Sequence, residues 1–222
     1  MKSILLSPNI ILLWFPTCRR ASKAMMRMQE HYENPRFRGQ VFTSDEFSKW
    51  YRGRRKRSTY CDDWAGFHFT RASIEPFYSG DFQPLHKYER TVLRLCRNLP
   101  ANGSIIGVSE TVVRRDQSVM WHELAHAMYN VDIKYRHAQQ RLLRRHDMSA
   151  LLKVVSILKY HKAVHIDEMQ AYMVSDQFDP CLPCDPVGDF QVKVTRRFMA
   201  NFVKAVRRQG VDFPINDATL LK

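Results

Sequence analysis

The stretch Trp121–Tyr129, with the sequence WHELAHAMY, places two histidines four residues apart and a glutamate directly after the first. In a helix of about 3.6 residues per turn, residues four apart share a face, so His122 and His126 can reach one metal ion. Glu123 lies about 100° further round the helix, where it can reach a water molecule held on that metal. Apolar residues at positions 121, 124, 125 and 128 form a stripe beside the histidines and predict an amphipathic helix.

The motif His122–His126, of the form H-E-x-x-H, resembles the zinc-binding helix of the zincin metallopeptidases. Members of that family bind zinc with the two histidines and a third ligand further along the chain, and their glutamate activates water for peptide hydrolysis. The resemblance implies a Zn²⁺ cofactor bound by His122 and His126, with Glu123 as the catalytic residue. It also implies a zincin-like architecture, in which a small sheet precedes the motif helix, a helical part follows it, and zinc lies in the cleft between them.

A catalytic zinc site needs three protein ligands and one open position for water, so the two histidines require a third ligand. The segment Asp167–Tyr172 is predicted to be helical, and its Glu168 resembles the third ligand of the glutamate-ligand zincins, the gluzincins. Two alternatives remain open. Asp132 occupies the third-ligand position of the metzincin pattern, although Tyr129 replaces the glycine of that pattern. His137 follows the motif in a way that resembles the third histidine of the basic, DNA-associated SprT-like proteases.

The remaining sequence predicts an α+β domain that is mostly helical. Ser104–Ser109 is predicted to form a short strand, and the zincin resemblance makes it the sheet edge that pairs with an extended substrate. The apolar residues 4–15 are predicted to form a core strand. The helix at 147–160 carries a dense apolar run and is expected at the centre of the core. Helical spacing of apolar residues predicts helices at residues 17–32, 85–99, 133–146, 147–160 and 161–176.

Local signals mark several further segments. Thr43–Glu46 is a capping box, T-x-x-E, that begins a short helix. The basic run Arg52–Arg57 after it is predicted to be a solvated loop, with a nucleic-acid patch or a processing site as alternatives. The aromatic-rich segment Tyr60–Ser73 is predicted to be strand or turn. Pro180–Pro186 is predicted to be a proline-rich turn containing C-x-x-C, and Asp189–Gln209 a closing helix.

Composition limits the classes of protein to which the chain can belong. A chain of 222 residues that is 45% hydrophobic fits a single domain, residues 1–222, with a sizeable core. The net charge of +13 attracts anionic partners such as nucleic acid. Five scattered cysteines favour a reducing intracellular compartment over a disulfide-stabilised one. No apolar run reaches the roughly 18 residues of a membrane helix, so no transmembrane segment is predicted.

These features predict a zinc-dependent peptidase that hydrolyses bonds in a peptide or protein substrate with a metal-activated water. Glu123 would take a proton from that water, and Tyr129 or Tyr172 would donate a hydrogen bond to the developing oxyanion. Two alternatives belong to other classes. One is a basic nucleic-acid-associated protein, such as a SprT-like protease acting on DNA-bound proteins, and the other is an inactive zincin-fold binding module. The intact motif His122–His126 favours an enzyme over the inactive module.

Overall fold

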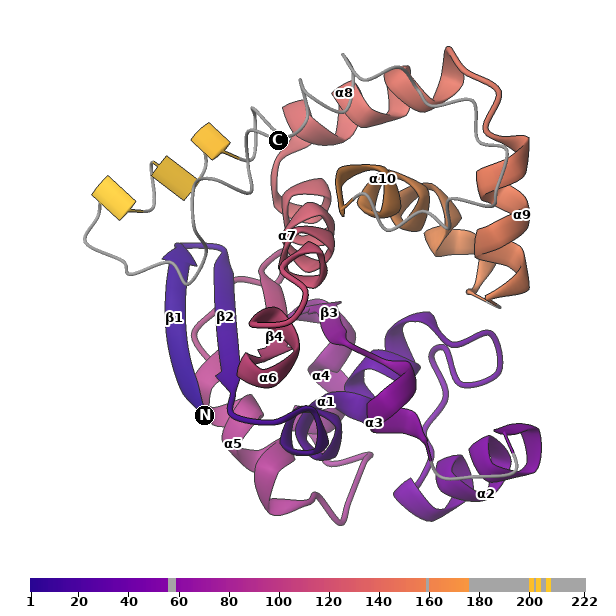
Figure 1. Ribbon diagram of the computed structural model, residues 1–222. Coiled ribbons are helices and arrows are strands. Elements are labelled where there is room, and N and C mark those ends of the chain that lie inside the picture. The colour runs from indigo at the N-terminus through magenta and orange to yellow at the C-terminus, as the bar shows by residue number, and fades with distance from the viewer. Residues whose placement is uncertain (56–58, 159, 176–199, 202, 205–206, 209–222) are drawn as a thin grey trace.

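The structure is a computed structural model that describes residues 1–55, 59–158, 160–175, 200–201, 203–204 and 207–208 (Figure 1). The predicted proline-rich turn Pro180–Pro186 and most of the predicted helix Asp189–Gln209 lie outside these residues. Ala200 and Val203, which belong to that predicted helix, are helical and are buried in the same core as the motif helix.

Helices dominate the described chain and, together with one small sheet, confirm the predicted α+β class. Every segment that helical spacing predicted within the described residues contains a helix. None of the described helices is both long and apolar enough to cross a membrane. The α-helices in chain order are α1 (Cys18–Glu33), α2 (Ser44–Arg55), α3 (Tyr60–Asp63), α4 (Glu75–Ser79), α5 (Lys87–Cys96), α6 (Glu110–Val113), α7 (Ser118–Val131), α8 (Ile133–Arg144), α9 (Ser149–Ile157) and α10 (His165–Ser175).

The start of α2 has the predicted capping geometry. Glu46 N–H donates to Thr43 Oγ1 at 3.1 Å, and Thr43 N–H donates to Glu46 Oε2 at 2.7 Å. This reciprocal pair satisfies backbone donors that the helix cannot pair internally. The helix continues through Arg55, so the first part of the basic run Arg52–Arg57 is helical and the predicted loop there is wrong.

Four strands form one mixed sheet before the motif helix in the chain. They are β1 (Lys2–Ser7), β2 (Ile10–Phe15), β3 (Gly66–Thr70) and β4 (Ser104–Ser109), and their order across the sheet is β1-β2-β4-β3. β2 and β4 run parallel, whereas β1 pairs antiparallel with β2 and β3 pairs antiparallel with β4. The predicted strand at Ser104–Ser109 is therefore confirmed.

Two expectations about the sheet are wrong. Ser104–Ser109 is an interior strand, because β2 pairs with one side of it and β3 with the other, so β3 is the edge strand beside it. Residues 4–15 belong to two strands, because the chain turns at Pro8 and Asn9 and returns antiparallel. The first error concerns which strand pairs with which, and local sequence pattern does not encode that. The second could have been avoided, because Pro8 and Asn9 are typical turn residues.

Alternation of side chains along the strands divides the core between the two faces of the sheet. On one face, Leu12 and Ile106 pack in the same cluster as the buried residues of α7. On the other face, Leu13 and Phe69 pack with α1 and α5. The same alternation in β3 directs His68 towards α7, where its ring stacks on a histidine of the motif. The sheet thus separates two helical layers and presents β3 to the motif helix.

Two further segments differ from their predicted form. Tyr60–Asp63 is helix α3, and the strand of this aromatic segment begins only at Gly66. The predicted strand is therefore present at Gly66–Thr70, whereas the first four residues of the segment are helical and not strand or turn. Helix α9 is not central to the core, because the side chains of Leu152 and Ile157 are 43% and 65% exposed. Its apolar residues surround the helix, whereas neighbouring elements cover only one side.

Candidate metal centre

The two histidines of the motif lie on the buried side of α7, and α10 packs against α7 and brings Glu168 to them (Figure 1). His122 Nε2 and His126 Nε2 lie 3.0 Å apart. Carboxylate oxygens of Glu168 lie 3.6 Å from His122 Nε2 and 3.5 Å from His126 Nε2. The structure therefore brings together the three residues that were predicted as metal ligands.

The two separations to Glu168 fit a tetrahedral zinc better than hydrogen bonds, whereas the 3.0 Å between the histidine nitrogens is also a hydrogen-bond distance. Two ligand atoms that each lie about 2.0–2.1 Å from a tetrahedral zinc are about 3.3 Å apart. Separations of 3.5 and 3.6 Å are long for hydrogen bonds between imidazole and carboxylate. Glu168 Oε2 is buried and has no hydrogen-bond partner among the described residues. A buried carboxylate oxygen without a donor is costly unless a cation satisfies it, so this donor set fits Zn²⁺.

A chain of polar side chains lies behind His126, beginning with the partly buried Asp167, which contacts the ring as an ion pair and not through a hydrogen bond of regular geometry. The Nδ1 atom of His126 lies 2.9 Å from Asp167 Oδ1. The same oxygen accepts a hydrogen bond from Gln170 Nε2 at 2.9 Å, and Gln170 Oε1 accepts one from the Tyr135 hydroxyl at 2.9 Å. A carboxylate behind a metal-binding histidine fixes its tautomer and leaves the Nε2 lone pair for the metal. Asp167, which was not predicted as a site residue, is placed for this role.

The charge of the cluster favours a cation. Burial opposes protonation of His126, but the carboxylates of Asp167 and Glu168 outweigh it and raise the pKa of His126 well above its usual range. Burial lowers the pKa of His122. The two carboxylates thus create a negative potential at a buried pair of imidazoles, where a divalent cation would be stabilised.

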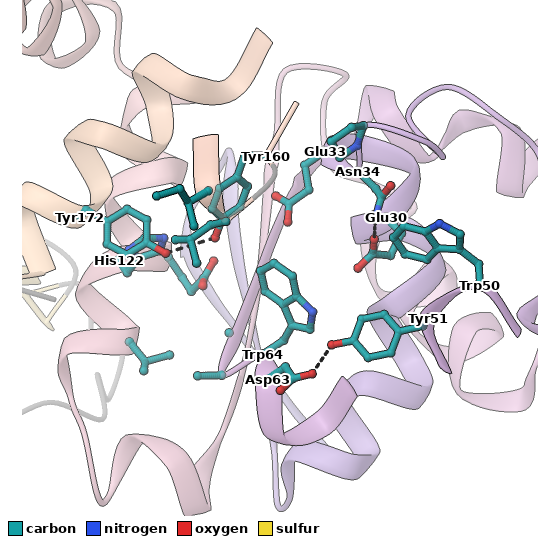
Figure 2. A pocket seen from close by; sticks show the side chains of 17 residues that line it. Glu30, Glu33, Asn34, Trp50, Tyr51, Asp63, Trp64, His122, Tyr160 and Tyr172 are labelled. Carbon is teal, nitrogen blue, oxygen red and sulfur yellow. Dashed lines mark hydrogen bonds between the residues drawn. The ribbon is translucent and has the colours of Figure 1, made fainter. Parts of the chain in front are cut away.

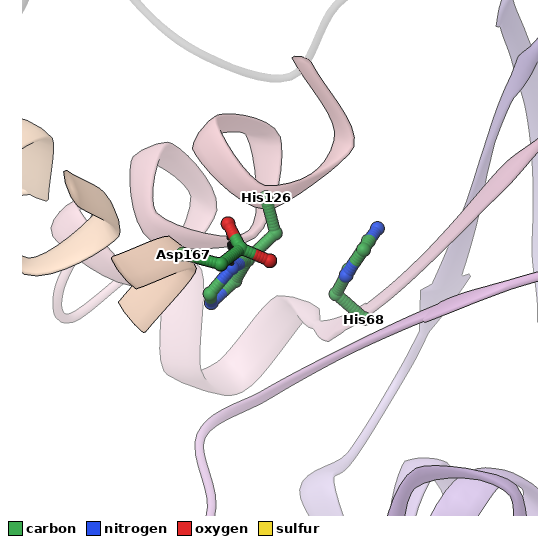
Figure 3. A group of neighbouring side chains, drawn as sticks. All are labelled: His68, His126 and Asp167. Atoms are coloured by element: carbon green, nitrogen blue, oxygen red, sulfur yellow. Dashed lines mark ion pairs between the residues drawn. The ribbon is translucent and has the colours of Figure 1, made fainter. Parts of the chain in front are cut away.

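A second group of potential ligands consists of His68, His126 and Asp167 (Figure 3). The rings of His68 and His126 are stacked, with 5.3 Å between centroids and 15° between planes. Imidazole lone pairs lie in the ring plane, so stacked rings direct them side by side and not towards one ion. His68 Nε2 lies 3.2 Å from Ser104 Oγ, within hydrogen-bond distance. We therefore consider the group containing Glu168 the better metal site.

The alternative third ligands are not in either group. Asp132 caps α8, because its Oδ1 accepts hydrogen bonds from the backbone N–H groups of Lys134 and Tyr135 at 2.8 and 3.0 Å. This carboxylate oxygen is thus used by the helix that follows the motif. His137 lies within α8 and is exposed. Of the three candidates, the structure brings only Glu168 to the two histidines.

Glu123 lies beside the start of β3. A Cβ atom built at Gly66 would lie 2.7 Å from Glu123 Cδ, so a side chain at position 66 would collide with the glutamate. Glycine at position 66 leaves the space that the Glu123 carboxylate occupies, and a larger residue would push that carboxylate aside. Burial raises the pKa of Glu123 to about 8, and the charge of His126 opposes this rise. A general base is most effective when its pKa lies near the working pH.

A pocket of about 560 Å³ opens beside His122 and Glu123 (Figure 2). Tyr172 packs edge-on against the His122 ring, with 4.8 Å between centroids. Its hydroxyl lies 3.4 Å from that of Tyr160, which also lines the pocket. Burial raises the pKa of both tyrosines, so both keep their protons at neutral pH. Of the two predicted oxyanion donors, Tyr172 lines the pocket, whereas the Tyr129 hydroxyl accepts a hydrogen bond from Gln140 elsewhere.

The outer edge of β3 is partly occupied. His68 N–H donates to Gln29 Oε1 of α1 at 2.9 Å. A backbone donor that is already paired cannot bind a substrate strand, so pairing along the whole of β3 has no support in the geometry. Only the end of β3 at Gly66, with the preceding residues Trp64 and Ala65, lines the pocket.

Several pocket residues could not be recognised from the motif. Glu30 and Glu33 lie in the last turns of α1, where polar residues usually indicate a solvated face. Both are buried. Their position was the one indication in the sequence that they are not ordinary solvated residues. A helix C-terminus has a partial negative charge and disfavours acidic side chains. Nothing in the sequence marked Trp64 or Tyr160 as a pocket residue.

Comparison with known proteins adds no family to these observations. No protein-family model, curated protein or solved structure matches the chain. The interpretation of the centre therefore depends on the geometry of its own residues, above all on the convergence of His122, His126 and Glu168.

Proposed function

We propose that the chain is a zinc-dependent peptidase in which His122, His126 and Glu168 bind Zn²⁺ and Glu123 is the general base. The observation that carries the proposal is the convergence of the buried ligand atoms, including the unsatisfied Glu168 Oε2, beside a pocket that contains Glu123. Zinc bound in such a site polarises a substrate carbonyl and lowers the pKa of water from about 15.7 to about 7.

The residues around the pocket have distinct roles in this proposal. The Glu123 carboxylate takes a proton from the attacking water and delivers it to the nitrogen of the leaving amine. Its contact with Gly66 limits how far the carboxylate can move. The Tyr172 hydroxyl, beside His122, donates a hydrogen bond to the carbonyl oxygen as negative charge develops there. Asp167 keeps His126 in the tautomer that binds metal.

Removal of the metal tests the proposal. We expect the purified protein to cleave a mixed peptide library, a chelator to abolish cleavage, and one equivalent of Zn²⁺ per chain to restore it, because water is a poor nucleophile without the metal. Mass spectrometry of the fragments gives the measurement, and chelator already saturated with zinc gives the control. Cleavage that persists in demonstrably metal-free protein would rule out the zinc mechanism.

Gly66→Ala is expected to lower kcat/KM by about 10- to 100-fold while zinc content stays at the wild-type level. The added methyl group would displace the Glu123 carboxylate, whereas the metal ligands lie elsewhere on the cluster. A misplacement of about 1 Å at a reacting group can cost about 100-fold in rate. Turnover and metal content are measured on the same preparation.

The matched control is Gly53→Ala in α2, where a built Cβ has no atom within 4 Å. We expect this variant to keep wild-type turnover, since alanine is also the better helix former. Equal turnover of Gly66→Ala and Gly53→Ala would contradict the placement of Glu123.

A further inference from the structure

Negative charge is concentrated in the pocket although the chain is strongly basic. Lysine and arginine exceed aspartate and glutamate by 13 over the whole chain. The described residues that line the pocket nevertheless include no lysine or arginine, and four of them are acidic, namely Glu30, Glu33, Asp63 and Glu123. Burial raises the pKa of Glu33 and of Glu123, and a cation bound beside them would favour their charged forms. The pocket therefore offers acidic partners for a cation in spite of the net charge.

Glu33 is a buried carboxylate that faces this space. Its side chain is in the last turn of α1, is only 6% exposed, and points into the pocket between Tyr160 and Trp64 (Figure 2). Gln29 supports it with a hydrogen bond, but no lysine, arginine or histidine of the described chain forms an ion pair with it. Burial and the charges of nearby carboxylates raise its pKa well above the usual range. A buried carboxylate without a cation is destabilising, and the negative end of α1 adds to the cost.

The other walls of the pocket are aromatic. Trp64 and Tyr160 pack edge to face, with 6.0 Å between ring centroids, and together form one wall beside Glu33. Trp50, Tyr51 and Tyr172 also line the pocket. Aromatic faces attract ammonium and guanidinium groups through their quadrupoles, and more strongly where water is excluded. A carboxylate at the end of an aromatic passage is a recognition site for an organic cation.

The dimensions and position of the pocket suit part of a peptide. Its volume of about 560 Å³ lies within the range of about 300–1,000 Å³ that is typical of ligand sites. Val119, Ile157 and Leu158 contribute apolar surface that can contact an alkyl chain. His122 and Glu123 line the same pocket, so a group bound by Glu33 would hold the rest of the substrate beside the proposed catalytic base.

We propose that the pocket selects substrates by a cationic group, an ammonium or guanidinium, held by the Glu33 carboxylate beside the packed rings of Trp64 and Tyr160. The inference depends on the proposed peptidase function and names its substrate class. These substrates are peptides that carry lysine or arginine near the cleaved bond, or a free α-amine at that place.

Matched peptides test this selection. One peptide sequence is prepared with lysine, norleucine or glutamate at each position in turn, and each version carries either a free or an acetylated N-terminus. We expect wild-type kcat/KM for the best lysine or free-amine peptide to exceed that for its neutral counterpart by about 10-fold or more, since the ligand cation pairs with a buried carboxylate. Glu33→Gln should remove this preference, so that the ratio of kcat/KM for the cationic peptide to that for its neutral counterpart falls to about 1. Glu75→Gln, which removes the same charge from an exposed site, should keep the preference.

The design separates the possible outcomes. A preference abolished by acetylation identifies the α-amine as the bound group, whereas a preference for lysine in acetylated peptides identifies the side chain. Wild-type protein that cleaves charged and neutral peptides equally overturns the inference, whether or not Glu33→Gln folds. If wild-type protein cleaves nothing, the peptidase proposal fails, and fluorescence anisotropy with the lysine and norleucine peptides still decides the pocket. Equal binding of the two peptides would then overturn the inference as well.

Discussion

Glu123→Gln is expected to reduce peptide turnover by about 100- to 10,000-fold, the range that removal of a positioned general base costs. Glutamine preserves the shape of the side chain and its contact with Gly66 but cannot take a proton. The residue lies on α7 between two proposed ligands without being one of them, so zinc binding should persist. Single-turnover cleavage of one defined peptide, with zinc content measured on the same sample, gives the comparison.

A charge-matched control excludes a general electrostatic effect. Glu110→Gln also removes one negative charge, but Glu110 lies at the start of α6 and pairs with the exposed Arg114. We expect this variant to cleave like the wild type. Unchanged cleavage by Glu123→Gln would remove Glu123 from the mechanism, because no other change in that variant could compensate for a missing base.

Glu168→Ala is expected to raise the zinc dissociation constant by more than about 100-fold. Loss of a residue that only orients a ligand, without binding the metal itself, raises it by about 10- to 100-fold. The substitution leaves only His122 and His126 as ligands, and a stable catalytic site requires three. The fold should persist, because Glu168 Oε2 is a buried acceptor without a hydrogen-bond donor among the described residues, and its burial is a cost that alanine removes. Competition with a chromophoric chelator measures the constant.

Three comparison variants distinguish the roles of nearby residues. Asp167→Ala removes the support of His126 and should weaken zinc binding by about 10- to 100-fold. Asp132→Ala and His137→Ala should leave zinc affinity unchanged, although Asp132→Ala should cost about 1 kcal/mol of stability through loss of the α8 cap. Tight zinc binding by Glu168→Ala, combined with loss in the Asp132 or His137 variant, would show that the third ligand had been misassigned.

Glu168 was selected through its resemblance to the third ligand of the gluzincins, and helical spacing, which is a local property, predicted the face on which it lies. Spacing places Glu168, Tyr172 and Ser175 on one face of a predicted helix, and in α10 that face meets the motif helix. Ser175 Oγ lies 3.5 Å from His122 Nδ1, and Tyr172 contacts the ring of the same histidine. The motif predicted the histidine face of α7, and helical spacing predicted the Glu168 face of α10. The sequence did not give the distance between these two faces.

Features that depend on distant partners could not be predicted in the same way. The short apolar segment Ser104–Ser109 indicates a strand, but its interior position depends on pairing with β2, which lies far away in the chain. The apolar run of α9 indicates a helix, but burial depends on which neighbours cover it. Glu30 and Glu33 resemble a solvated helix end until other parts of the chain enclose them in the pocket. The local sequence pattern thus identified the helices, the strands and the motif. The pocket that Glu30 and Glu33 line forms only through tertiary contacts.

The most direct measurement is anomalous diffraction at the zinc absorption edge from crystals of the zinc-loaded protein. We predict one zinc peak per chain, about 2.0–2.1 Å from the Nε2 atoms of His122 and His126 and about 2.0–2.2 Å from a carboxylate oxygen of Glu168. A peak bound instead by His68, the Nδ1 atom of His126 and Asp167, or the absence of any peak at the motif, would contradict the proposed centre.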